Sequence, residues 1–278
     1  MIIGDVSGQL KVAANRFRGN GQDFWTGPLS TVDAEITAQT CEDYDQHFVT
    51  TRNMVAEFVG WYEAGEFDRV NGTSTQQENF PDYQIPEVIL NWPAHGRDYA
   101  PFNEDFYLAP FIDRDGDGTY DPSGAGDYPA YDLGNEQDCQ QRIVNIYGDQ
   151  NLWWIFNDKG NVHTETGSQS SGMEIRAQAF AFATSDEVNN MTFYNYELVN
   201  RSTFTLTDTY FGYWVDADLG YARDDYVGCD VTRGLGYAYN GDNFDEDASG
   251  RPGYGAIPPA IGVDFFQGPF QDADGVDN

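Results

Sequence analysis

Residues 152–156 read Leu-Trp-Trp-Ile-Phe, and the four residues after them read Asn-Asp-Lys-Gly. A short apolar run that is rich in aromatic side chains and ends at turn residues predicts a strand leaving through a hairpin-type turn. Residues 174–184 extend this pattern. Ile175 and four alanines fall on one face of the expected strand, and Phe180 and Phe182 fall on the other. Both faces are therefore expected to be covered at that end.

Further strands are expected after this pair. Apolar and aromatic segments recur at residues 191–200, 204–215, 235–239 and 261–266, and short polar links separate several of them. Such a series is typical of an antiparallel sandwich. We therefore predict an all-β fold, an antiparallel β-sandwich with a small helical insertion and long loops.

The first 150 residues are less regular. Residues 10–14 favour a short strand. Residues 51–67 predict the clearest helix, because apolar side chains recur at helical spacing from Val55 to Tyr62 and Thr51 can cap its start. A mobile polar stretch is expected at residues 71–79, and a short helical turn is expected from Pro86. We predict an irregular part over residues 1–150 with short strands, one helix and a metal loop. The sandwich part over 151–278 is expected to be continuous with it and truncated at its end.

Composition limits the classes of function. The chain has 278 residues and a net charge of −32, and its acidic residues are 32 Asp against 14 Glu. An excess of Asp indicates loops, turns and metal sites, whereas the 15% of aromatic residues indicates a folded core. So negative a surface repels nucleic acid and anionic membranes. No apolar run is long enough to span a membrane, and the three widely spaced cysteines do not suggest zinc.

A loop of alternating aspartates follows Ile112. Residues 113–121 read Asp-Arg-Asp-Gly-Asp-Gly-Thr-Tyr-Asp. The expected oxygen ligands are the side chains of Asp113, Asp115 and Asp117, the Thr119 carbonyl, and Asp121 directly or through water. Alternate positions turn these ligands inward, and the glycines permit a tight bend, so the loop predicts a Ca²⁺ site. The alternative is a solvated acidic turn.

The predicted calcium loop departs from an EF-hand at its end. Gly124 occupies the twelfth position, where the bidentate Glu would stand, and Asp127 is a candidate substitute from farther on. The flanking sequence does not predict two helices. The loop therefore resembles a dockerin-type or thrombospondin-type calcium loop more than a regulatory EF-hand.

A second acidic cluster lies just past an expected strand end. It consists of Asp216 and Asp218, followed by Asp224 and Asp225. The cluster is either a second metal site or a solvated, helix-capping loop. A third run, from Asn240 to Asp247, favours a hydrated loop.

The sequence predicts no enzymatic activity, since it contains no nucleophile elbow, phosphate loop or dinucleotide fingerprint. His47 and His95 are isolated, and His163 and Glu165 share one face of an expected strand without a third ligand. The six tryptophans either form a sugar-stacking platform or fill the core, and the core is the commoner role.

Six segments together resemble the amino-terminal region of large surface proteins that the bacterial type IX secretion system exports. They are residues 8–14, 91–96, 148–154, 156–160, 216–220 and 224–230. The resemblance covers most of the chain and implies export, surface display and a structural or adhesive role. It carries over no catalytic residue, and neither the signal peptide nor the sorting domain of such proteins lies within these 278 residues.

The sequence thus predicts an extracellular, calcium-binding structural protein, a segment of a bacterial surface filament, appendage or adhesin. A homo- or hetero-oligomeric surface assembly is the expected partner, with a glycan or another cell-surface target as a further candidate. A secreted carbohydrate-binding or glycan-degrading module is the alternative.

Overall fold

The chain folds into two compact units, residues 1–210 and residues 211–278. The computed structural model describes residues 2–5, 10–16, 19–97, 103–131, 133, 145–247 and 250–268. The first unit extends past residue 150, where the sequence places a division. Strands from both sides of that residue pair within one sheet of this unit.

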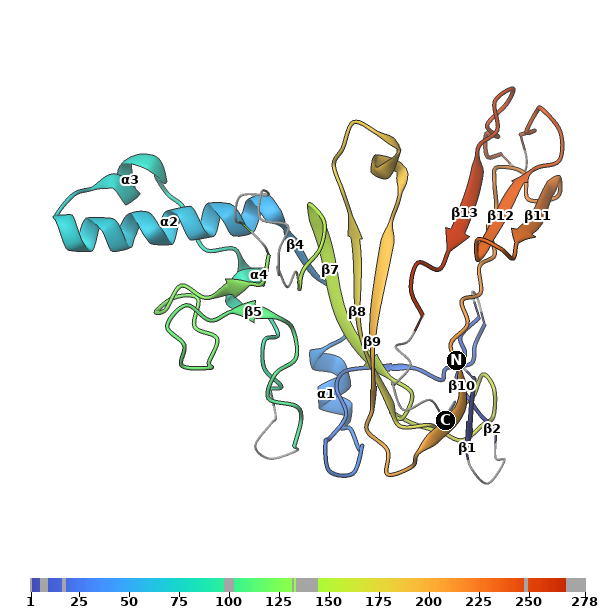
Figure 1. Cartoon of the computed structure of the whole chain (residues 1–278), viewed down its shortest axis with the longest axis horizontal. Helices are drawn as coiled ribbons and strands as arrows, with labels where there is room; N and C mark the ends of the chain where they lie inside the picture. Colours follow the sequence, from blue (N-terminus) through green and yellow to red (C-terminus); the bar gives the residue numbers. More distant parts are fainter. Residues whose placement is uncertain are drawn as a thin grey trace. The chain divides into compact units, whose positions relative to one another are not determined.

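A five-stranded antiparallel sheet organises the first unit (Figure 1). Its three long strands are β7 (Gln150–Asn157), β8 (Met173–Ala181) and β9 (Phe193–Asn200). They confirm the strands expected at 152–156, 174–184 and 191–200. Two short strands, β3 (Trp25–Thr26) and β4 (Phe48–Thr51), pair with opposite ends of β7. A 3₁₀ turn, η1 (Glu187–Asn190), lies between β8 and β9.

Two smaller sheets complete the first unit. One has the order β10-β1-β2, with β10 (Leu206–Tyr210), β1 (Ile2–Asp5) and β2 (Leu10–Val12). The other pairs β5 (Phe111–Ile112) with β6 (Tyr128–Pro129), so the predicted calcium loop is the connection between two antiparallel strands.

The second unit is built on a three-stranded antiparallel sheet. Its order is β11 (Asp225–Asp230), β12 (Leu235–Asn240) and β13 (Ala260–Asp264). The strands expected at 235–239 and 261–266 are confirmed, although β13 begins and ends slightly earlier. The first strand was not predicted, because its acidic start resembles a loop.

One long helix, α2 (Arg52–Asn71), confirms the predicted helical insertion and continues four residues past it. The Thr51 hydroxyl accepts the Met54 amide as the predicted cap, and the helix ends at Gly72, whose φ of +67° suits a residue without a Cβ. The other helices are α1 (Ala38–Asp43), α3 (Thr75–Asn79) and α4 (Glu87–Leu90), the last of which is the expected turn after Pro86.

The helix α3 corrects the prediction of a mobile stretch at residues 71–79. The Asp68 carboxylate accepts the backbone amides of Thr75 and Gln76 at 2.8 and 2.7 Å. Burial opposes the charge of this carboxylate, but these bonds and one from the Thr73 hydroxyl lower the pKa of Asp68 to about 2. An aspartate of α2 therefore caps the start of α3. Because this polar interaction produces no apolar periodicity, the sequence pattern did not predict the helix.

The main core lies against one face of β7. Trp153 and Ile155 of this strand are buried with Phe48 of β4 and Phe58 of α2. Trp92 joins them after α4, with its ring centroid 6.2 Å from that of Trp153. These residues show that the helical segment and the loops after it cover this face of the sheet.

The fold is mostly β, with antiparallel pairing between all the strands named above and few helices. Among the described residues, no helix is both long enough and apolar enough to cross a lipid bilayer.

Candidate functional site

The predicted calcium loop turns tightly between β5 and β6. The Asp113 carboxylate accepts the backbone amides of Gly116 and Gly118, each at 2.8 Å. Gly118 has a φ of +80°, which a side chain would strain. The bond from the Gly118 amide, opposed by a smaller burial effect, holds the pKa of Asp113 below its ordinary value. Asp113 is therefore ionised and fixed at the start of the loop.

Three carboxylates converge in this loop. Asp113, Asp115 and Asp127 each place one oxygen within 4.8 Å of the others. Asp127 is fully buried and accepts the amides of Arg114 and Asp121, both at 2.8 Å. Burial, and then the charges of Asp113 and Asp115, raise the pKa of Asp127. A bound cation would offset this repulsion, and three hard oxygens suit Ca²⁺. We call these three residues the aspartate triad.

The other predicted loop ligands lie outside the triad. Asp117 accepts the Thr119 amide at 2.6 Å, and Asp121 accepts the Gly124 amide at 2.8 Å. Asp117 and Thr119 are exposed. Two of the predicted side-chain ligands, Asp113 and Asp115, therefore belong to the triad. Its third carboxylate is that of Asp127, six residues after Asp121.

His95 connects the end of the loop to the rest of the unit. Its Nε2 accepts the Tyr120 amide at 2.9 Å, and its Nδ1 lies 2.9 Å from the Phe106 carbonyl oxygen. Because a carbonyl only accepts, Nδ1 carries the proton and the ring is neutral in this arrangement. The ring also stacks on Phe106 with a centroid distance of 4.2 Å. His95 is a structural support for the loop.

The second predicted cluster lies in the second unit. Asp225 begins β11, and its Oδ2 accepts the Leu219 amide at 2.9 Å. Asp216 and Asp218 are exposed. Over the described residues, these aspartates form no group comparable to the triad. The carboxylate oxygens of Asp224 are buried. A hydrogen bond between the Asp224 and Glu246 side chains raises the pKa of Glu246.

His163 is a buried structural residue. Its Nδ1 lies 2.9 Å from the Val12 carbonyl oxygen, and its Nε2 lies 2.6 Å from that of Asp158. Glu165 instead pairs with Arg16. The two side chains therefore do not form the start of a metal site.

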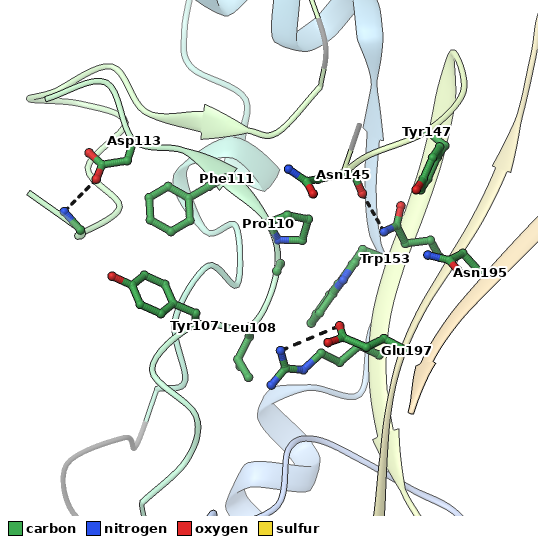
Figure 2. A pocket seen from close by; sticks show the side chains of 14 residues that line it. Tyr107, Leu108, Pro110, Phe111, Asp113, Asn145, Tyr147, Trp153, Asn195 and Glu197 are labelled. Atoms are coloured by element: carbon green, nitrogen blue, oxygen red, sulfur yellow. Dashed lines mark hydrogen bonds and ion pairs between the residues drawn. The ribbon is translucent and has the colours of Figure 1, made fainter. Parts of the chain in front are cut away.

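A cavity of about 550 Å³ opens beside the aspartate triad (Figure 2). Its wall on the sheet side is polar. Gln178 of β8 pairs with Asn195 of β9. Two residues along the same strands, Arg176 pairs with Glu197. The facing wall is the segment from Tyr107 to Phe111, together with Asp113 and Gly118 of the loop.

The polar row in β8 was missed in the sequence. Glu174, Arg176 and Gln178 alternate with Ile175 and Ala177, so they share the face that also carries Phe180. Alternation of polar residues within a strand expected to be covered on both faces is a signal for a buried site or an ion network.

The tryptophans differ in their exposure. Trp92 and Trp153 are 4% and 2% exposed and belong to the core, whereas Trp214 is 73% exposed. Trp25 and Trp154 line a second cavity of about 320 Å³ in the first unit. Trp153 also borders the larger cavity, so one core residue contributes to its wall.

No protein-family model, curated protein or solved structure matches this chain.

Proposed function

We propose that the chain is an extracellular, calcium-binding structural protein. The convergence of Asp113, Asp115 and Asp127 supports this proposal most directly. The three carboxylates repel one another, and Ca²⁺ would neutralise them while ordering a loop that is largely exposed. Calcium at extracellular millimolar concentration would fill even a modest site.

The wider setting that we propose is a bacterial surface filament, appendage or adhesin exported by type IX secretion. Its support is the sequence resemblance, together with the strand edges and abundant aromatic residues of so acidic a chain. We further propose that the antiparallel sheets of the first unit belong to a β-sandwich. An experimental structure of the protein would test that arrangement by showing whether two of these sheets pack face to face. We propose no catalytic function.

Calcium binding is tested by thermal unfolding of metal-free protein with and without CaCl₂. We expect calcium to raise the melting temperature, because it binds only the folded loop. Asp115→Ala removes one ligand and should abolish most of this rise. Asp117→Ala is the matched control, since Asp117 lies in the same loop but outside the triad. Identical melting curves with and without calcium would refute the proposal.

A carbohydrate-binding role is the second candidate. The cavity beside the triad favours it, because aromatic and hydrogen-bonding side chains line the same space.

A further inference from the structure

The larger cavity lies entirely within the first unit. Its volume of about 550 Å³ falls within the range of roughly 300–1,000 Å³ that small-molecule sites occupy. One wall is a regular sheet surface, because Trp153, Gln178 and Asn195 stand in register across β7, β8 and β9. The site is therefore built on the most extensive sheet of the unit.

The polar groups of that wall are held in place from behind. Arg176 is 10% exposed, and its guanidinium contacts the Asp105 carboxylate at 2.8 Å and the Glu174 carboxylate at 3.0 Å. The Gln178 side chain donates to the Asn145 backbone carbonyl at 2.9 Å and accepts from the Asn151 side-chain Nδ2 at 3.0 Å. Binding would therefore require little side-chain ordering at these two positions.

Other polar groups remain available to a ligand. Asn195 and Glu197 are exposed, and Glu197 approaches Arg176 no closer than 4.0 Å. Figure 2 shows both side chains on the sheet side of the cavity. Among the described residues, the Asn195 amide and the Tyr147 hydroxyl have no hydrogen-bond partner. These planar and hydroxyl groups can donate and accept together, as pairs of sugar hydroxyls require.

The remaining walls are aromatic. Tyr107 and Phe111 belong to the segment that leads into the aspartate loop, and their rings lie on the loop side of the cavity, whereas Tyr147 and Trp153 lie on the sheet side (Figure 2). An apolar ligand would leave the Asn195 amide and the Tyr147 hydroxyl without partners, whereas an ion would not use the aromatic rings. A pyranose presents both an apolar C–H face and equatorial hydroxyls.

Charge restricts the class of sugar. Asp113 and Glu197 border the cavity as carboxylates, and the Arg176 guanidinium is already compensated by Glu174 and Asp105. The site is therefore negative or neutral, which disfavours uronic and other acidic sugars.

We propose that this cavity binds a neutral or amino-sugar unit of a glycan. Aromatic rings would stack on the sugar, and Arg176, Gln178, Asn195 and Glu197 would bind its hydroxyls. The proposal specifies the carbohydrate-binding candidate above and does not depend on calcium binding.

The test is calorimetric titration of the purified full chain with defined oligosaccharides. The probes are glucose-, mannose- and N-acetylglucosamine-based oligosaccharides, with a uronate oligosaccharide for comparison. We expect at least one neutral or amino-sugar probe to bind and the uronate to bind at least tenfold more weakly. Asn195→Ala and Glu197→Gln should each weaken binding at least fivefold. Asn190→Ala and Glu187→Gln in η1 are matched exposed controls and should leave binding unchanged.

Three results would overturn the assignment: no binding by any probe, preference for the uronate, or equal binding by the wild type and the Asn195→Ala/Glu197→Gln double variant. Far-ultraviolet circular dichroism of the variants separates loss of the site from loss of the fold. A calcium-dependent rise in melting temperature without sugar binding would leave the calcium proposal intact and reject this one. Sugar binding without a calcium-dependent rise in melting temperature would support the sugar proposal and reject the calcium proposal.

Discussion

Glu174 is the residue on which the buried charges of the central sheet depend. It is fully buried, and it accepts hydrogen bonds from Arg176, Arg201 and the Leu29 amide. Both guanidiniums also contact Asp105, so two cations and two carboxylates form one network. Such a network stabilises the fold only while every member is paired.

We therefore expect Glu174→Gln to lower the free energy of unfolding by about 3–5 kcal/mol, because it leaves two largely buried cations facing one carboxylate. Urea unfolding measures the change. Glu197→Gln on the neighbouring strand is the control, since Glu197 is exposed and should matter by less than about 0.5 kcal/mol. A loss below about 1 kcal/mol for Glu174→Gln would mean that the network is not stabilising.

The lowered pKa of Asp105 makes the free energy of unfolding depend on pH. Burial opposes its charge, but hydrogen bonds from Arg201 and Arg176 outweigh burial and hold the pKa of Asp105 below its ordinary value. The folded state then binds this proton less readily than the unfolded state, so the contribution of Asp105 is complete above about pH 5 and is lost as the pH falls. Asp105→Asn should flatten the decline in unfolding free energy between about pH 5 and pH 3. A decline as steep as that of the wild type would contradict this assignment.

At the scale of elements, α2 depends on its ends. Thr51 caps the first turn, and exchanging such a cap for alanine typically costs about 1 kcal/mol. Thr51→Ala should therefore lower the unfolding free energy by roughly that amount, whereas Thr51→Ser keeps the hydroxyl and should cost clearly less. Chemical denaturation of the two variants side by side measures the difference. Equal losses would show that packing of the methyl group, and not the cap, is responsible.

Periodicity made the long elements predictable, whereas a strand that begins with polar side-chain-to-backbone bonds was not predicted. The apolar alternation around Ile175 and the helical spacing from Val55 to Tyr62 both correspond to real elements. The acidic start of β11 concealed a strand, because Asp225 resembles a loop residue in the sequence, whereas in the fold its carboxylate accepts the Leu219 amide. Short-range polar bonds of this kind leave no periodic trace in the sequence.

The aspartate loop was half predictable for a similar reason. Alternate spacing identifies Asp113 and Asp115, whose local amide bonds shape the turn. Asp127 joins them because β6 returns antiparallel to β5 and brings the end of the loop back to its start. The polar wall of the cavity needed still more distant information, since it depends on the register of β8 with β9.

At the scale of the whole molecule, the net charge of −32 opposes association of one copy with another. Calcium would lower this repulsion, so the proposed assembly should weaken when calcium is removed. Electron microscopy and light scattering of native material with calcium and with chelator would show the change. Interfaces should bury more than about 1,000 Å² in total, as specific contacts do. Monomers under both conditions would contradict the assembly role.

Asp113 is part of the aspartate triad and also lines the larger cavity. Each ligand can bind alone, but contact with a shared residue provides a route for coupling, and thermodynamic linkage makes any such coupling reciprocal. If calcium bound in the loop raises the affinity of the cavity for a sugar tenfold, bound sugar must raise the affinity of the loop for calcium by the same factor. A glycan-coated surface would then keep the loop filled in calcium-poor surroundings, and attachment itself would protect the loop from losing its ion.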